Sequence, residues 1–306
     1  MMGFSLADIY SSIERIENVI PVESLSKRLR FGEHKSVFKS TGHDFDQIKE
    51  YDPEDDSIFE ILWNSIGTDG KLYVRKAIAT KEFPAVILGD LSTSMTFGVD
   101  YRCKERMFLE TMGNIGMTCS HGQDPMGFIG FAEDILFDEQ PRLGQDHVDY
   151  LIEEVYKFFQ AISSDGKGKL DRKKTDFDKA FRFFSERYAN NQCFVVAISD
   201  FIGVEEFANS QILKDVANQH EVVFIFLDDP EEFKFSGPGY IKMENMETGE
   251  QISVSRRMSS NFIRNRRKNI REELRNIGVD SMVLEYGKHF QRLHRFFLAR
   301  QESFRG

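Results

Sequence analysis

Cysteine is scarce in this sequence of 306 residues, and long apolar runs are missing from it. The three cysteines, Cys103, Cys119 and Cys193, lie far apart and form no C-x-x-C pair. Neither a disulfide framework nor a thiolate zinc site is expected, and the cysteines are predicted to be reduced, buried thiols. No segment approaches the roughly 18 consecutive apolar residues of a membrane helix, and the N-terminal residues lack the basic flank and apolar run of a secretory signal. These absences predict a cytoplasmic protein without a membrane segment.

The short motifs of several enzyme classes are also missing. No G-x-S-x-G segment is present, and Gly166-Lys-Gly168-Lys169 has neither the spacing of a phosphate-binding loop nor a buried strand before it. The seven histidines are scattered, with no two placed one helical turn apart beside an acid, and we expect them at the surface. Because no nucleophile and base can be paired from the sequence, we expect a protein without enzymatic activity.

The charge balance is acidic, with 50 Asp and Glu against 40 Lys and Arg and a formal net charge of −10. Phosphate neutralisation needs an excess of basic groups, so this balance argues against a general nucleic-acid binder. Phenylalanine is frequent, with 29 residues beside a single tryptophan. This composition indicates a core filled mainly by unfunctionalised rings.

Apolar runs alternate with helical spacing along most of the chain after Pro84. The near-continuous apolar runs 193–198 and 221–227 are typical of parallel strands covered by helices on both faces. The predicted strands are 85–88, 126–131, 135–137, 193–198, 221–227 and 281–285, and the predicted helices are 104–118, 148–162, 177–188, 204–217, 262–275 and 288–300. The pattern predicts an open α/β sheet with one antiparallel edge hairpin.

The first part of the chain has a different character. An amphipathic helix is expected over 5–20, followed by a loop-rich region with a few strands, including a hairpin around Asp69-Gly70 that leads into 71–75. We therefore divide the chain into a small helix and strand region, residues 1–82, and an α/β domain, residues 83–306.

Oxygen-bearing side chains follow two of the predicted buried strands. The first strand ends in Asp90, with Ser92 and Ser94 at alternate positions, and a later strand is followed by Asp200. Thr175 lies directly before a predicted helix, on a loop that reaches the same edge. Open α/β sheets bind ligands at this edge, and two carboxylates with three hydroxyls suit Mg²⁺ or Mn²⁺. The alternative is that Ser92, Thr175 and Asp200 are helix caps.

Taken together, D-x-S-x-S after a strand, Thr before a later helix and Asp closing another strand resemble the metal-ion-dependent adhesion site of von Willebrand factor A domains. The resemblance implies a von Willebrand factor A-like, Rossmann-type fold that binds Mg²⁺, or alternatively Mn²⁺ or Ca²⁺. It also implies that Ser92, Ser94 and Thr175 bind the metal directly and that Asp90 and Asp200 bind it directly or through water. The open coordination position would take a carboxylate from a partner protein.

A narrower resemblance covers most of the chain. The sequence is similar to bacterial domain-of-unknown-function family 58, in segments that follow one another in order. These segments are 42–45, 49–56, 63–64, 72–75, 228–232, 237–239 and 247–249. Members typically accompany MoxR-type AAA+ ATPases, so the resemblance implies an adaptor or co-chaperone for such an ATPase and for a client protein.

Two other functions remain open from the sequence. The predicted basic helix 256–275 carries eight Lys and Arg residues that would suit a nucleic-acid-associated protein: Arg256, Arg257, Arg264, Arg266, Arg267, Lys268, Arg271 and Arg275. Alternatively, Asp90 and Asp200 could hold Mg²⁺ in a phosphohydrolase, although no general base beside them is evident. The adaptor function is preferred, with no nucleic acid as partner.

Overall fold

The computed structural model describes residues 4–14, 47–52, 61, 72–76, 84–96, 103–164, 175–200, 207–229, 240–244 and 251–303. The chain forms two compact units, one made of Met1–Lys27 with Phe83–Gly306 and the other of Arg28–Glu82. The predicted turn at Asp69-Gly70 and the loop around Gly166 lie outside the described residues. Among the described residues, no helix is long and apolar enough to cross a membrane.

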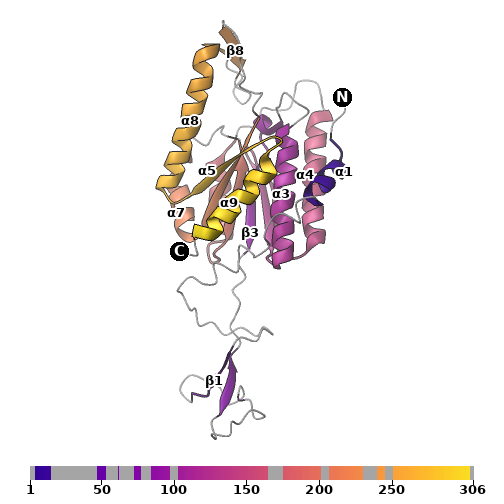
Figure 1. The fold of residues 1–306 in the computed structure, drawn as a ribbon, viewed down its shortest axis with the longest axis vertical. Coiled ribbons are helices and arrows are strands. Elements are labelled where there is room, and N and C mark those ends of the chain that lie inside the picture. The colour runs from indigo at the N-terminus through magenta and orange to yellow at the C-terminus, as the bar shows by residue number, and fades with distance from the viewer. Residues whose placement is uncertain are drawn as a thin grey trace. The chain divides into compact units, whose positions relative to one another are not determined.

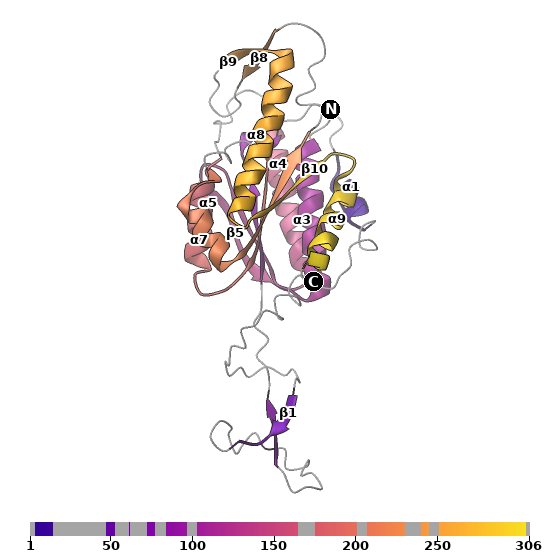
Figure 2. The same ribbon diagram turned by 60° about the vertical axis from the view of Figure 1, so that its left-hand side comes forward.

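A six-stranded sheet forms the centre of the larger unit, in the order β5-β4-β3-β6-β7-β10 (Figures 1 and 2). Its strands are β3 (Ala85–Asp90), β4 (Met126–Phe131), β5 (Ile135–Arg142), β6 (Phe194–Ser199), β7 (Glu221–Asp228) and β10 (Asp280–Glu285). All neighbours are parallel except β4 and β5, which form the antiparallel edge. Counted along the chain this is the order 3-2-1-4-5-6 of doubly wound sheets. The predicted α/β class and its edge hairpin are confirmed.

Helices cover both faces of the sheet (Figure 2). They are α1 (Leu6–Glu14), α3 (Cys103–Gly122), α4 (Gln145–Ser164), α5 (Phe177–Arg187), α7 (Gln211–Gln219), α8 (Arg256–Asn276) and α9 (His289–Ser303). Helices α1, α3, α4 and α9 lie on one face, and α5, α7 and α8 lie on the other. Residues 204–206 of the predicted helix 204–217 lie outside the described residues, and the described part is interrupted at 208–210. Helix α7 begins at Gln211, where the Ser210 side chain accepts a hydrogen bond from the Leu213 N–H and caps the helix.

Phenylalanine rings fill the core, as the composition indicated. On the α5 face, Phe181 lies 4.7 Å from Phe207 and 5.9 Å from Phe224 between ring centroids. On the α3 face, Phe108 meets Phe128 and Phe159 edge to face. The two faces of the sheet are therefore packed by separate groups of rings. Cys119 and Cys193 are buried free thiols, as predicted.

The opening helix α1 packs against α3 and α4. The Tyr156 hydroxyl donates a hydrogen bond to the Phe4 carbonyl at 3.3 Å, and an Arg106 N–H donates to Ser12 Oγ at 3.3 Å. The side chains of Ile9 and Ile13, both in α1, are buried. This helix, which the sequence grouped with the strand region as residues 1–82, thus shares a compact unit with the sheet.

Two short hairpins complete the described structure. In the smaller unit, β1 (Gln47–Glu50) pairs antiparallel with β2 (Tyr73–Lys76), and Ile61 bridges to Val74. In the larger unit, β8 (Tyr240–Glu244) pairs antiparallel with β9 (Gln251–Ser255), directly before α8. The sequence analysis did not predict β8 and β9.

The expectation that the histidines lie at the surface is wrong for His147, His220 and His289, which are buried. His220 Nδ1 accepts a hydrogen bond from the Cys193 N–H at 3.2 Å, and its ring packs edge to face on Phe184. These neighbours offer no acid to stabilise an imidazolium. Burial accordingly lowers the pKa of His220 to about 4.

Acid should therefore destabilise the fold through His220. The unfolded chain binds a proton at this residue with a pKa near 6.5, whereas the folded chain does so only near 4. The stability that folding gains from the neutral ring is complete above pH 6.5 and is lost as the pH falls toward 4, a loss of about 3 kcal/mol. Denaturant unfolding should show that the free energy of unfolding changes less between pH 7 and pH 4.5 in His220→Asn than in wild type. The amide oxygen of asparagine can replace Nδ1 as the hydrogen-bond acceptor. An equal change in the free energy of unfolding for both proteins would contradict this effect of His220.

Candidate functional site

The candidate site lies where the sheet changes winding direction. From β3 the sheet continues to β4 on one side and to β6 on the other, and both are parallel to β3. β3 ends at Asp90 and β6 ends at Ser199, with Asp200 directly after it. Carboxyl ends of strands at such a switch point are the usual place for ligand binding in open α/β sheets.

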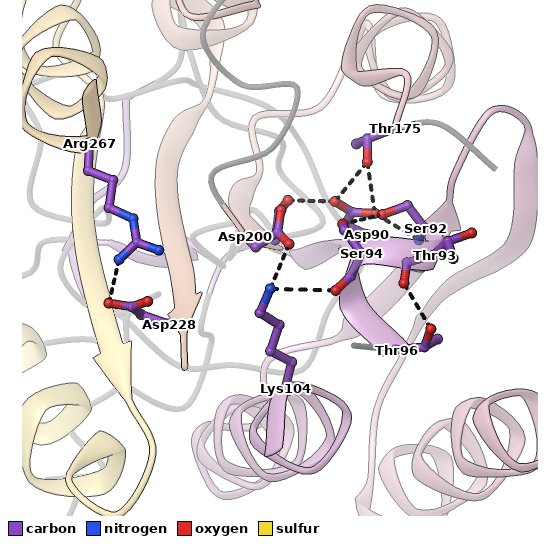
Figure 3. Close-up of polar contacts among 11 residues, drawn as sticks. Asp90, Ser92, Thr93, Ser94, Thr96, Lys104, Thr175, Asp200, Asp228 and Arg267 are labelled. Carbon is purple, nitrogen blue, oxygen red and sulfur yellow. Dashed lines mark hydrogen bonds and ion pairs between the residues drawn. The ribbon is translucent and has the colours of Figure 1, made fainter. Parts of the chain in front are cut away.

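The Asp90 carboxylate lies at the centre of the site (Figure 3). Its Oδ1 accepts a hydrogen bond from the Ser92 N–H at 2.9 Å, which forms a local turn. Its Oδ2 accepts from the Ser199 hydroxyl at 2.5 Å and from the Thr175 hydroxyl at 3.3 Å. Asp90 therefore joins three segments that are far apart in the sequence. Ser199 was not predicted as a site residue, although it directly precedes Asp200 at the same strand end.

The two serines lie beside this carboxylate. Ser92 Oγ and Ser94 Oγ are 3.0 Å apart, and both residues are buried at the start of a short 3-10 helix, Thr93–Thr96. The structure thus brings together the Asp90, Ser92, Ser94 and Thr175 side chains predicted from the sequence.

The helix-cap alternative does not hold for Thr175. The cap of α5 is the next residue, Asp176, whose side chain accepts a hydrogen bond from the Lys179 N–H at 2.9 Å. The Thr175 hydroxyl is directed instead toward Asp90, as Figure 3 shows. One residue therefore begins the helix while its neighbour supplies a hydroxyl to the site.

The electrostatics of the site are dominated by buried negative charge. Asp90 is fully buried and Asp200 nearly so. Burial, followed by the charge of Asp200, raises the pKa of Asp90 to about 7, although hydrogen bonds from Ser199 and Ser92 oppose the shift. Accumulated charge of this kind favours a bound cation.

A buried lysine, which sequence reasoning missed, meets this charge. Lys104, from the first turn of α3, lies with its Nζ 3.0 Å from Asp200 Oδ2 and 3.5 Å from the Ser94 carbonyl oxygen. The Asp200 carboxylate therefore faces Asp90 on one side and an ammonium on the other (Figure 3). The pairing joins residues 96 positions apart, and no local sequence pattern reports it.

The close packing around β3 explains the glycine directly before Asp90. A Cβ at Gly89 would lie 2.6 Å from Phe108 Cζ and 2.7 Å from Phe128 Cε2. These rings come from α3 and β4 and pack closely on the α3 face of the strand end that carries Asp90. Glycine at position 89 allows that contact.

The donor set suits a hard divalent cation. Within the described part of the chain, no three His, Cys, Asp or Glu side chains gather, so a zinc-type site is not formed there. Asp90, Asp200, Ser92, Ser94 and Thr175 instead offer only oxygen atoms, of which two carboxylates supply the charge. Such a set matches the preferences of Mg²⁺ and, less strictly, Mn²⁺ or Ca²⁺.

The basic helix α8 uses much of its described charge within the fold. Arg267 Nη1 lies 2.6 Å from Asp228 Oδ2 at the end of β7, and Arg271 donates to the Ser281 carbonyl at 3.2 Å. Lys268 pairs with Glu272 one turn along the helix at 3.5 Å. The side chains of residues 256–264 lie outside the described set. These intramolecular contacts favour a structural role for Arg267 and Arg271 over phosphate binding.

The chain was compared with known proteins, solved structures and family models. The uncharacterized proteins Rv1480 of Mycobacterium tuberculosis and Mb1516 of Mycobacterium bovis are each 23% identical over 239 residues, covering 76% of this chain and 70% of theirs. The crystal structure of conserved hypothetical protein BatB from Bacteroides thetaiotaomicron aligns at 14% identity and a TM-score of 0.41, over 72% of this chain and 99% of that one. The family model described as protein of unknown function DUF58 matches residues 47–276. The chain therefore belongs to the DUF58 family.

Proposed function

We propose that this protein is a non-enzymatic, metal-dependent protein-interaction module that binds a carboxylate of its partner through a divalent cation at the carboxyl edge of the sheet. The observation that carries the proposal is the convergence of Asp90, Ser92, Ser94 and Thr175 at one point, with Asp200 beside them. These residues come from three separate connections of the sheet. A set of side chains that serves only as helix caps has no reason to converge in this way.

In this proposal each group has a definite task. Ser92, Ser94 and Thr175 offer neutral hydroxyl oxygens to the cation, which limits the negative charge of the site. Asp90 and Asp200 supply the charge, directly or through water. When bound, the cation supplies an electrophilic contact for a carboxylate of the partner. Ser199 and the Ser92 N–H hold the Asp90 carboxylate in place by hydrogen bonds.

The partner we propose is a MoxR-type AAA+ ATPase in the cytoplasm, with this protein as its adaptor or co-chaperone toward a client protein. Support comes from membership of the DUF58 family, because the resemblance to that family implies a partner of this kind. An acidic side chain of the ATPase or of the client would complete the coordination of the cation.

Divalent metal should stabilise the wild-type protein and leave a site variant unaffected. At 100 times the dissociation constant of the metal, mass action raises the free energy of unfolding by about 2.7 kcal/mol. Thermal unfolding and calorimetry with Mg²⁺ and Mn²⁺ should show this shift, and Asp90→Asn, which keeps the shape but not the charge, should abolish it. Asp178→Asn, at a half-exposed carboxylate on α5, is the matched control. No heat of binding at millimolar metal would contradict the proposal.

The partner is tested by affinity capture from cells of the native organism. Wild-type protein should recover an AAA+ ATPase in Mg²⁺ and lose it in EDTA, whereas Asp90→Asn should recover none in either buffer. Asp178→Asn should behave like wild type. Recovery of the ATPase by all three proteins in EDTA would show that the contact does not involve the metal site.

One observation favours a second candidate, a Mg²⁺-dependent phosphohydrolase. The pKa of Asp90 is raised to about 7, as expected of a general acid or base. Asp90 is nevertheless fully buried and accepts hydrogen bonds from Ser92, Ser199 and Thr175, which leaves it poorly placed to reach a substrate proton. Phosphate release from generic esters with Mg²⁺, abolished in Asp90→Asn, would replace the adaptor proposal with this one.

A further inference from the structure

A buried ammonium lies inside the proposed metal site. The Lys104 side chain is 2% exposed and its partner Asp200 is 4% exposed, with 3.0 Å between Nζ and Oδ2. The same Nζ lies 3.5 Å from the backbone carbonyl oxygen of Ser94, one of the proposed ligands. Figure 3 shows the lysine reaching from α3 to the gap between Asp200 and Ser94.

Burial of this ammonium costs free energy unless a partner of opposite charge offsets the loss of hydration. Removing an ammonium from water is unfavourable by several kcal/mol, and a single carboxylate at good distance only roughly offsets that cost. Here the ammonium pairs with Asp200, whose negative charge also acts on the buried Asp90 carboxylate. Lys104 thus places one positive charge where the proposed function requires a divalent ion.

We propose that Lys104 is the built-in cation of this site: its ammonium holds Asp200 in the metal-free protein and competes with the divalent ion for that carboxylate. This inference rests on the proposed metal-binding function. With Lys104 in place, the two carboxylates and the ammonium sum to a single negative charge when all are ionised. Without it, the same site would present two negative charges to the incoming metal.

Two consequences follow for metal binding. Lys104 stabilises the metal-free fold, because its ammonium pairs with the buried Asp200 carboxylate. It also weakens metal binding, because a divalent ion at the site meets a unit positive charge a few ångströms away in a poorly screened setting. The lysine therefore sets a weak affinity, so that metal and partner carboxylate must arrive together to hold the site in its bound form.

The experiment compares metal binding by wild type and Lys104→Met, which removes the charge but keeps most of the aliphatic stem. Mn²⁺ is titrated by calorimetry, and the metal-loaded proteins are then challenged with a chelator. We expect Lys104→Met to bind Mn²⁺ at least about tenfold more tightly than wild type and to lose it more slowly. Its melting temperature should fall below that of wild type in EDTA and recover in Mn²⁺.

Two further variants separate charge from packing. Lys104→Arg retains the positive charge and should retain weak binding, which a purely steric role for the lysine would not predict. Lys157→Met removes an exposed lysine on α4, 64% exposed, and should change neither affinity nor melting temperature. If Lys104→Met does not fold in EDTA, it is purified in Mn²⁺ and only the chelator challenge is used.

The outcomes distinguish this inference from the function on which it rests. Tighter Mn²⁺ binding by Lys104→Met than by wild type, with both proteins binding Mn²⁺, supports it. Equal or weaker binding by a folded Lys104→Met, with wild type binding Mn²⁺, overturns the role of Lys104 and leaves the metal site intact. Absence of binding by both proteins overturns the metal site itself and the inference with it.

Discussion

Phe181→Ala is expected to lower the free energy of unfolding by about 4 kcal/mol, because it removes a fully buried ring from the core on the α5 face. Phe181 stacks on Phe224 of β7 and touches Phe207, so its loss leaves a cavity bounded by rigid rings. Such neighbours collapse poorly into the space, which places the cost near the upper part of the usual range. Denaturant unfolding followed by circular dichroism measures the change.

The same helix offers a matched control. Phe183, two residues along α5, is only partly buried at the margin of this core. Phe183→Ala should cost much less than Phe181→Ala, since water already reaches part of its ring. A loss under about 1 kcal/mol for Phe181→Ala would show that the rings on this face are loosely packed. Because α5 begins just after Thr175, loosened packing should also weaken the proposed metal binding.

Glu110→Ala is expected to be the second severe change, at about 3 to 5 kcal/mol. The Glu110 carboxylate is 1% exposed and lies between two basic side chains, with Oε2 2.7 Å from His289 Nε2 and Oε1 2.9 Å from Arg106 Nε. Burial alone would raise the pKa of Glu110, but the hydrogen bonds from His289 and Arg106 outweigh it and lower the pKa. Alanine would leave the buried His289 and the partly exposed Arg106 without that carboxylate.

This carboxylate connects three helices on the α3 face. Glu110 belongs to α3, His289 begins α9, and Arg106 also donates a hydrogen bond to Ser12 of α1. Glu153→Ala, at a half-exposed residue paired with Lys157 on the surface of α4, is the control and should cost less than about 0.5 kcal/mol. Unfolding of both variants in guanidinium chloride measures the two losses of unfolding free energy. Equal, small losses would mean that α9 docks without help from this cluster.

Much of the larger unit could be predicted from the sequence because its signals are local. The runs at 85–90, 194–199 and 221–228 are apolar almost without interruption, as burial under two helix layers requires. The D-x-S-x-S segment follows the first of these strands, so its place at the sheet edge followed from the strand alone. For the same reason Thr175, directly before a helix, could be assigned to that edge.

The contacts that were missed depend on residues far apart in the chain. Lys104 meets Asp200 across 96 positions, and Glu110 meets His289 across 179. The local pattern around each of these residues gives no hint of a distant counter-charge, so Lys104 was not predicted as a site residue and the histidines were assigned to the surface. The hairpin of β8 and β9 had a usable signal, because apolar and polar residues alternate in both strands.

The strand order has a consequence for how the site arises during folding. Asp90 and Ser199 are 109 positions apart and meet only when β6 takes its place beside β3. A nascent chain that has formed β3, β4 and β5 already carries the D-x-S-x-S segment, but it lacks Thr175 and Asp200. Such a chain holds Lys104 without its carboxylate and offers no complete set of ligands. The proposed cation binding is thereby tied to the pairing of β6 with β3, and a chain that has not formed this pair lacks the proposed contact for a partner.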